Sequence, residues 1–96
     1  MLWYAGTMKN SKQLERHFKG AANHSRIDIL FLISGNPDIT VEGIAEGTHK
    51  NFKTVSEHTK RLVHAGLVNK SYRGRNVLHA LSPYGIKFVH FIKTFI

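Results

Sequence analysis

The chain is 96 residues long and 42% apolar, which suits one small folded domain with a modest hydrophobic core and argues against disorder. Its 14 Lys and Arg outnumber its 6 Asp and Glu, and the formal charge of +8 indicates a polyanionic partner. With no cysteine and no apolar run longer than residues 29–33, the sequence excludes disulfides and thiolate metal sites and contains no candidate membrane span.

Residues 1–10 are expected to precede a single domain that spans residues 11–96. The sequence leaves two interpretations of this segment open. Leu2, Trp3 and Tyr4 could form an N-terminal arm that packs on a partner subunit. Alternatively, Met8 is the native start and the residues before it are a remnant of expression.

Two helices are predicted at the start of the domain. The first begins after Asn10 or Ser11, either of which can cap it, and ends near Gly20. The second is capped by Asn23, and its apolar residues leave hardly any polar face. We therefore expect it to be the central, surrounded helix of the core, ended by the turn-forming residues 35–38.

The middle of the chain predicts two helices joined by a short turn. Ile39 is expected in a short strand, and Thr40 caps a third helix that its glycines weaken. Asn51 caps a fourth helix that runs to about residue 65 and stops at a glycine. The inner face of this helix is expected to consist of four residues at helical spacing, namely Phe52, Val55, Thr59 and Leu62.

Two strands and a last helix complete the domain. Residues 67–72 and 76–81 are rich in β-branched, aromatic and polar side chains and are joined through Arg73-Gly74-Arg75, which predicts a hairpin. Ser82 and Pro83 then open a last helix. We therefore predict a mainly α winged helix-turn-helix fold, with about five helices and a wing of two or three strands.

Positive charge is concentrated on the fourth helix and the hairpin, because residues 50–76 contain seven basic residues and one acidic residue. Such a helix is expected in the major groove of DNA, and the wing, residues 72–76, on phosphate or in the minor groove. Solvated charge on a helix face is the alternative interpretation. The residues expected to contact DNA are Lys50, Asn51, Lys53, Thr54, Glu57, His58, Lys60 and Arg61 on the helix and Tyr72, Arg73 and Arg75 on the wing.

The helical candidates are expected to play different roles. The amides at the start of the helix, with Asn51 and Thr54 beside them, suit a phosphate group. Lys53, Glu57 and His58 are expected near base edges, where Lys can donate to guanine and Glu can accept from cytosine. Glu57 could instead only orient Lys53 or Arg61.

The segment TVSEHTKRLVHAGLV, residues 54–68, resembles the recognition-helix region of the ArsR-type winged helix repressors of bacteria and archaea. Residues 23–30 are similar to the start of that family's second helix, and residues 81–85 resemble the junction between wing and last helix that is common in winged helices. The resemblance implies a homodimeric transcriptional regulator, with Ser56 also on the DNA side. Lys50 and Thr59 depart from the apolar residues that the family has at these positions.

Metal sensing, which many ArsR-type regulators perform, is not implied for this chain. Residues 41–47 contain no Cys, and His90 is the lone candidate ligand on the last helix. The seven His residues form no HExxH motif, and His58 and His64 lie on different faces of their helix. Neighbouring Ser, Glu and His side chains of the fourth helix cannot converge into a catalytic triad. We therefore expect no metal, no cofactor and no enzymatic activity.

The last helix carries more apolar residues than a core of this size needs. Such residues belong to the core by default, and we expect one row of them to form the seam of a homodimer as well. The predicted interface residues, from the first and last helices, are Leu14, Phe18, Phe88, Phe91, Ile92 and Phe95.

Together these features predict a sequence-specific regulator of transcription that binds double-stranded DNA as a homodimer, in the role of a repressor. We expect a soluble protein of the prokaryotic cytoplasm that is associated with the nucleoid and has no membrane partner. Two alternatives remain: a non-specific architectural DNA-binding protein, and a winged helix that binds another protein. The sequence identifies neither a small-molecule effector nor a metal effector.

Overall fold

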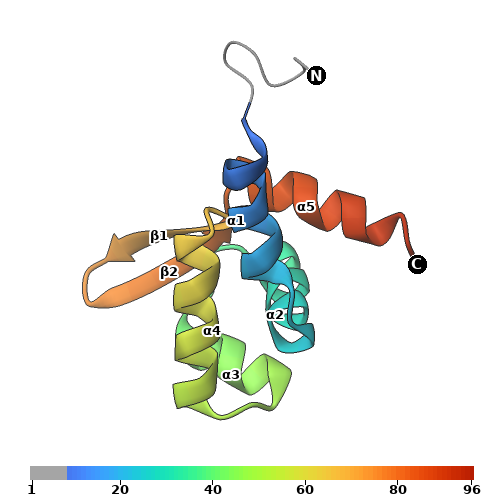
Figure 1. The fold of residues 1–96 in the computed structure, drawn as a ribbon. Helices are drawn as coiled ribbons and strands as arrows, with labels where there is room; N and C mark the ends of the chain where they lie inside the picture. The colour runs from blue at the N-terminus through green and yellow to red at the C-terminus, as the bar shows by residue number, and fades with distance from the viewer. Residues whose placement is uncertain (1–8) are drawn as a thin grey trace.

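The computed structural model describes residues 9–96 and confirms the predicted winged helix-turn-helix fold with a two-stranded wing (Figure 1). The hairpin and the last helix extend from opposite sides of the helical body. Residues 1–8 of the predicted arm lie outside the described residues. In chain order the elements are α1 (Ser11–Ala21), α2 (His24–Gly35), α3 (Val41–Thr48), α4 (Phe52–His64), β1 (Val68–Arg73), β2 (Asn76–Leu81) and α5 (Pro83–Lys93).

Side-chain caps set where the helices begin. Asn10 and Gln13 form a reciprocal capping box at α1, in which each side chain accepts a hydrogen bond from the other residue's backbone amide at 2.9 Å. Side chains also accept backbone N–H groups at the starts of the other helices, and these caps are Asn23, Thr40, Asn51 and Ser82. The predicted helix starts are therefore confirmed.

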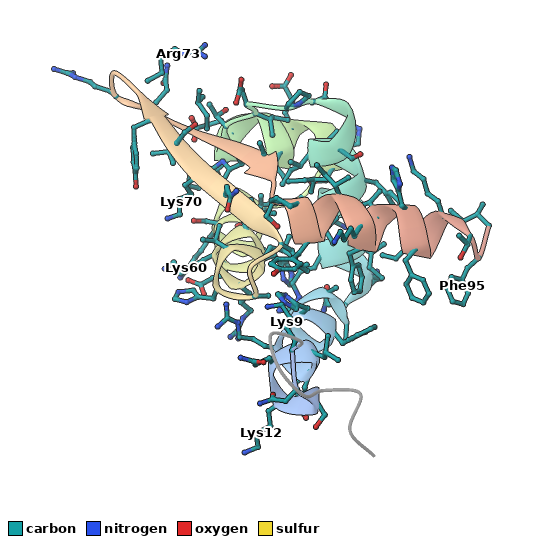
Figure 2. All side chains as sticks on the ribbon, turned by 90° about the horizontal axis from the view of Figure 1, so that it is seen from above. Lys9, Lys12, Lys60, Lys70, Arg73 and Phe95 are labelled. Carbon is teal, nitrogen blue, oxygen red and sulfur yellow. The ribbon has the colours of Figure 1, made fainter. Side chains whose placement is uncertain are left out.

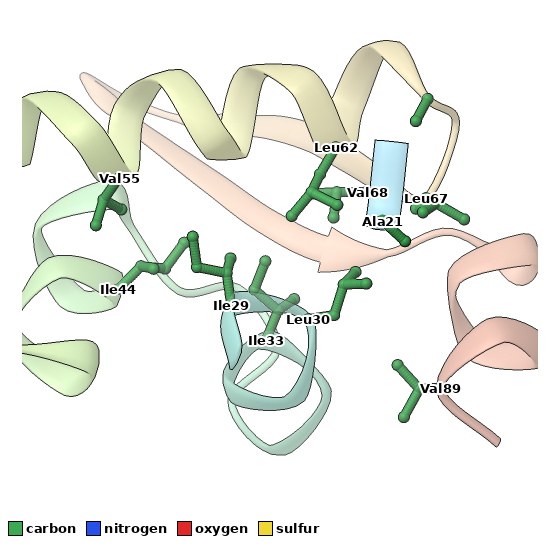
Figure 3. Packing of buried hydrophobic residues seen from close by; sticks show 11 residues of the cluster. Ala21, Ile29, Leu30, Ile33, Ile44, Val55, Leu62, Leu67, Val68 and Val89 are labelled. Atoms are coloured by element: carbon green, nitrogen blue, oxygen red, sulfur yellow. The ribbon is translucent and has the colours of Figure 1, made fainter. Parts of the chain in front are cut away.

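The core is built around α2, as expected. Ile29, Leu30 and Ile33 are at most 1% exposed, and they pack with buried side chains of α3, α4, β1 and α5 (Figure 3). Phe31 and Leu32 are only half-buried, because their side of the helix borders an open hollow on the surface. The prediction of a helix surrounded on every side is wrong at this point.

Three of the four residues predicted on the inner face of α4 are buried. Val55, Thr59 and Leu62 are 0%, 2% and 0% exposed, whereas Phe52 is 53% exposed. Phe52 is the first residue of α4, and the buried cluster reaches this helix only one turn later, at Val55. The prediction of Phe52 as a core residue is wrong for that reason.

The wing is an antiparallel hairpin in which Val68 pairs with Leu81 and Arg73 with Asn76. The loop therefore contains two residues, Gly74 and Arg75, rather than the predicted three, and Gly74 has the positive φ of 61° that such a turn needs. The expected short strand at Ile39 is reduced to one isolated bridge, with His79.

Elements from both ends of the chain meet at the turn of residues 65–67, which follows α4. The Ala65 carbonyl accepts from His17 Nδ1–H at 2.6 Å, and the Gly66 carbonyl accepts from the Ser82 hydroxyl at 2.6 Å. The Leu67 carbonyl accepts the backbone N–H of Ser82 at 3.0 Å. Gly66 has a φ of +77°, as predicted for a glycine that ends a helix.

Two glycines let helices approach this turn closely. A Cβ atom at Gly20 of α1 would overlap the side chain of Ala65. One at Gly85 of α5 would overlap the Leu67 carbonyl oxygen. Both positions therefore require a residue without a side chain.

Gly85→Ala is expected to lower the free energy of unfolding by about 1–3 kcal/mol, because the methyl group meets backbone atoms that cannot move aside without shifting α5 or the turn. Thermal and urea unfolding measure this loss. Gly35→Ala, at the last residue of α2, is the matched control, since a Cβ there meets nothing within 4 Å. Equal stability of the two variants would contradict the close approach.

His79 makes stability depend on pH. It is 2% exposed, and its Nδ1–H donates to the Ile39 carbonyl at 3.0 Å. Burial lowers the pKa of His79 below its usual 6.5, so the unfolded chain binds a proton more readily than the folded chain. The contribution of His79 to stability is therefore complete above pH 6.5 and is lost as the pH falls through the lowered pKa.

We expect the free energy of unfolding to decrease when the pH is lowered from about 7.5 to about 5, and the decrease to be smaller in His79→Gln. Urea unfolding at a series of pH values gives both slopes. His90→Gln removes an exposed imidazole from α5 and serves as the control. A slope that His79→Gln leaves unchanged would rule out this role for His79.

Candidate nucleic-acid interface

The turn between α3 and α4 fixes the angle of the helix-turn-helix. His49 adopts a left-handed conformation with a φ of 56°, which is uncommon outside glycine but which Asn, Asp and His adopt more often than other residues. The amides of His49 and Lys50 donate to the carbonyls of Glu46 and Ala45 at 3.3 and 3.1 Å, and these bonds satisfy the end of α3. The sequence analysis did not anticipate this role of His49, because a helix end of this kind normally carries glycine.

Two backbone amides at the start of α4 already have a hydrogen-bond acceptor within the protein. Asn51 Oδ1 accepts from the amides of Lys53 and Thr54 at 2.8 and 3.3 Å. The expectation that the helix N-terminal amides suit a phosphate group is therefore corrected for these two amides, because the asparagine carbonyl already occupies them.

The outer face of α4 is basic and exposed, because its opposite face is buried in the core. Five of the residues expected to contact DNA are exposed on α4: Lys53, Thr54, Glu57, Lys60 and Arg61. Glu57 Oε1 lies 3.7 Å from Lys60 Nζ, so its partner is Lys60 rather than the Lys53 or Arg61 considered from the sequence. This surface offers cationic donors at the spacing of successive helical turns.

Three other candidates on and before α4 are less accessible than expected. The side chain of Lys50 is 27% exposed and its Nζ lies 3.9 Å from Asp28 Oδ2, so it is directed back toward α2. Ser56 and His58 are both half-buried, because each lies at an edge of the face that packs on the core. The projection of His58 toward base edges is therefore corrected.

His58 has a distinctive environment. Its Nδ1 atom is buried and has no hydrogen-bond partner among the described residues. Burial lowers the pKa of the His58 imidazole below 6.5, and the positive charges of Arg26 and Arg61 lower it further. His58 is thus held neutral beside a concentration of positive charge from α2 and α4.

The wing projects basic and aromatic side chains into solvent. Tyr72 is 71% exposed, and Arg73 and Arg75 are exposed at the tip of the hairpin. Lys70 is also exposed on β1, although the sequence analysis did not single it out. Lys60, Lys70 and Arg73 project from one side of the molecule in Figure 2, so α4 and the wing form one basic surface.

Phe52 is exposed at the start of α4, although the sequence analysis assigned it to the core. It stands next to Lys53 at the start of α4, with half of its side chain exposed. Its position as the first helical residue was the signal available in the sequence.

The six candidate dimer residues come together on α1 and α5. Rings of Phe18 and Phe88 lie 5.5 Å apart, and the row continues through Phe91 to Phe95 with spacings of 6.5 and 5.1 Å, all edge to face. Phe18, Phe91 and Phe95 are 52%, 51% and 75% exposed. Leu14, Phe88 and Ile92 are half-buried beside them.

Among residues 9–96, no three His, Asp or Glu side chains are grouped closely enough to hold a metal ion. None of the helices in that range is long and apolar enough to cross a membrane.

Solved structures with the same fold come from several bacteria. A homodimeric winged helix-turn-helix DNA-binding domain from Mycobacterium bovis, described as a possible ArsR-family transcriptional regulator, is 26% identical, with a TM-score of 0.79 over 86% of this chain and 77% of its own. HlyU from Vibrio cholerae is 25% identical, with a TM-score of 0.79 over 91% and 95% of the two chains. NolR from Sinorhizobium fredii, at 16% identity, shares the fold with a TM-score of 0.78 over 88% and 85%.

The sequence itself matches a family. No curated protein matches the chain, but the family model for the bacterial regulatory protein arsR family matches residues 23–70, from the cap of α2 into β1. The resemblance inferred from the recognition-helix segment is therefore confirmed. The chain belongs to the bacterial ArsR family of regulatory proteins, as a DNA-binding transcription regulator of the winged helix-turn-helix type and not an enzyme.

Proposed function

We propose that the chain acts as a homodimer that binds an inverted repeat in double-stranded DNA and represses transcription, in the cytoplasm of a prokaryotic cell, associated with the nucleoid. The observation that carries this proposal is the single basic surface formed by the outer face of α4 and the wing. The α4 helix enters the major groove with this face, and the two copies of α4 in a dimer lie about 34 Å apart.

Residues in the first two turns of α4 contact the base edges. Lys53 and Glu57 are exposed one turn apart, where Lys donates to guanine and Glu accepts from cytosine. Phe52 adds an exposed ring beside them, which suits contact with a thymine methyl group. Thr54, Lys60 and Arg61 contact the sugar-phosphate backbone on either side of these residues.

The wing contributes affinity more than specificity. Arg73 and Arg75 stand on either side of Gly74 at the tip of the hairpin, where they reach phosphate or the minor groove. Tyr72 is exposed next to them and can donate its hydroxyl proton to a phosphate oxygen.

The homodimer proposal rests on the aromatic row of α1 and α5. Half or more of the Phe18, Phe91 and Phe95 side chains is exposed, and these residues form one contiguous apolar strip with Phe88. A strip of this kind on a small domain marks an interaction surface. A second copy is the occupant we propose, since the similar domain from Mycobacterium bovis is a homodimer.

Lys53→Gln is expected to relax specificity at one base pair, at a cost of about 1–3 kcal/mol on the preferred site.

Arg75→Gln is expected to weaken binding to all duplexes alike and to reduce the slope of log K against log salt by about 1. Selection of sites from a random duplex pool, followed by titration at several salt concentrations, measures both effects. Lys12→Gln on α1 removes the same charge away from α4 and the wing and is the control.

The same titrations separate this proposal from its rivals. A selected site that binds less than about tenfold more tightly than scrambled duplex would favour a non-specific architectural role, because specific binders exceed about a thousandfold. Wild-type binding that does not respond to salt would contradict DNA recognition by α4 and the wing and would favour a protein-binding module.

Phe91→Asp is expected to convert the dimer to monomers, because it places a carboxylate in the middle of the aromatic row. Sedimentation equilibrium measures the change, and thermal unfolding at equal subunit concentration checks that the monomer is folded. Ile86→Asp, at a residue of α5 that is 48% exposed but not part of the row, is the control. A Phe91→Asp protein that remains dimeric would show that the subunits associate elsewhere.

A further inference from the structure

A second basic site borders the surface assigned to DNA binding and shares Glu57, Lys60 and Arg61 with it. A cleft of about 650 Å³ opens between α1, the start of α2 and the C-terminal half of α4. We call it the basic cleft, and the basic residues that line it are Arg16, Lys19, Arg26, Lys60, Arg61 and His64. Four of these, Arg16, Lys19, Arg26 and His64, had no role in the sequence analysis.

Helix packing creates this cleft. The α1 helix meets the end of α4 where Gly20 lies against Ala65. Away from that point long side chains from both helices extend into the gap between them, and Ala65 forms part of the lining. The basic residues of the cleft thus come from three separate helices, and no single segment of the sequence contains them all.

The charges in the basic cleft are poorly compensated. Glu57 is the one acidic residue in its lining, and it is paired with Lys60. Lys19 is paired with Glu15 at 3.8 Å, in a pair that is well exposed to solvent. In the part of the chain that the structure describes, Arg16, Arg26 and Arg61 take part in no salt bridge.

Arg26 offers the cleft only part of its guanidinium group. Its Nε atom is buried, makes no hydrogen bond to any described residue and is out of reach of a ligand in the cleft. The two terminal guanidinium nitrogens are the donors that remain, and arginine donors suit the oxygens of phosphate groups in particular. Burial lowers the pKa of the neighbouring His58, and the charges of Arg26 and Arg61 lower it further.

We propose that the basic cleft binds phosphate groups, with the guanidinium groups of Arg16, Arg26 and Arg61 as the principal ligands. Its volume lies in the range of small-molecule sites, so a free phosphorylated molecule can enter it. Lys60 and Arg61 also belong to the outer face of α4, so a phosphate of the duplex backbone can reach the same groups. The second source depends on the DNA-binding function proposed above, whereas the first does not.

The first arm of the test uses no DNA. Inorganic pyrophosphate is titrated into the full-length protein, and binding is followed by backbone amide shifts in NMR spectra. We expect saturable shifts at the residues lining the basic cleft, at least tenfold weaker binding by Arg16→Gln and Arg26→Gln, and no change in Lys12→Gln. Lys12 lies on the same helix as Arg16, outside the cleft, and its removal changes the net charge equally.

The second arm measures duplex binding by the same variants over a range of salt concentrations. If the phosphate comes from DNA, Arg16→Gln reduces the slope of log K against log salt by about 0.9 relative to Lys12→Gln. If it comes from a free molecule, this slope is unchanged while pyrophosphate binding is lost.

Each result decides the proposal. Arg16 is exposed, so its variant is expected to fold even if Arg26→Gln does not, and thermal unfolding checks both. The proposal is overturned if Arg16→Gln and Lys12→Gln agree in both arms. If the wild-type protein binds no duplex, the proposed DNA-binding function is refuted. The pyrophosphate titration then still decides whether the basic cleft binds phosphate groups.

Discussion

The turn of residues 65–67 is the point on which the rest of the structure depends. It ends the recognition helix α4 and begins the wing, and each of its three carbonyls has a partner from a distant element. His17 of α1 satisfies one carbonyl, and Ser82 at the start of α5 satisfies the other two. Because buried backbone groups are costly to leave without partners, α1, α4, the wing and α5 are held in one fixed arrangement.

This arrangement links the apolar row to the basic surface. Gly20 and Gly85 bring α1 and α5 into contact with the same turn, and both helices carry the row of phenylalanines on their outer sides. A rotation of α1 or α5 would break hydrogen bonds at the turn and would tilt the end of α4. The relative positions of two recognition helices in a dimer would therefore be set through side chains that touch neither DNA nor the other subunit.

The sequence predicted the features that are determined locally and missed those that are not. Caps such as Asn51 and the left-handed Gly66 were predicted correctly because both act on their immediate neighbours. Phe52 was misassigned because helical spacing alone does not tell where the core ends. The pairing of Lys50 with Asp28 and the basic cleft depend on contacts between elements, so no local pattern could indicate them.

The positive charge of this domain serves binding rather than stability. Its described salt bridges are three pairs at 3.7–3.9 Å, each with at least one well-exposed side chain, and such pairs contribute little. The core is apolar and contains almost no charge, although the buried hydroxyl oxygen of Thr59 has no hydrogen-bond partner among the described residues. The cations of α1, α2, α4 and the wing therefore repel one another with little internal compensation. An anion that enters this field relieves the repulsion, which makes the binding of polyanions favourable and dependent on salt.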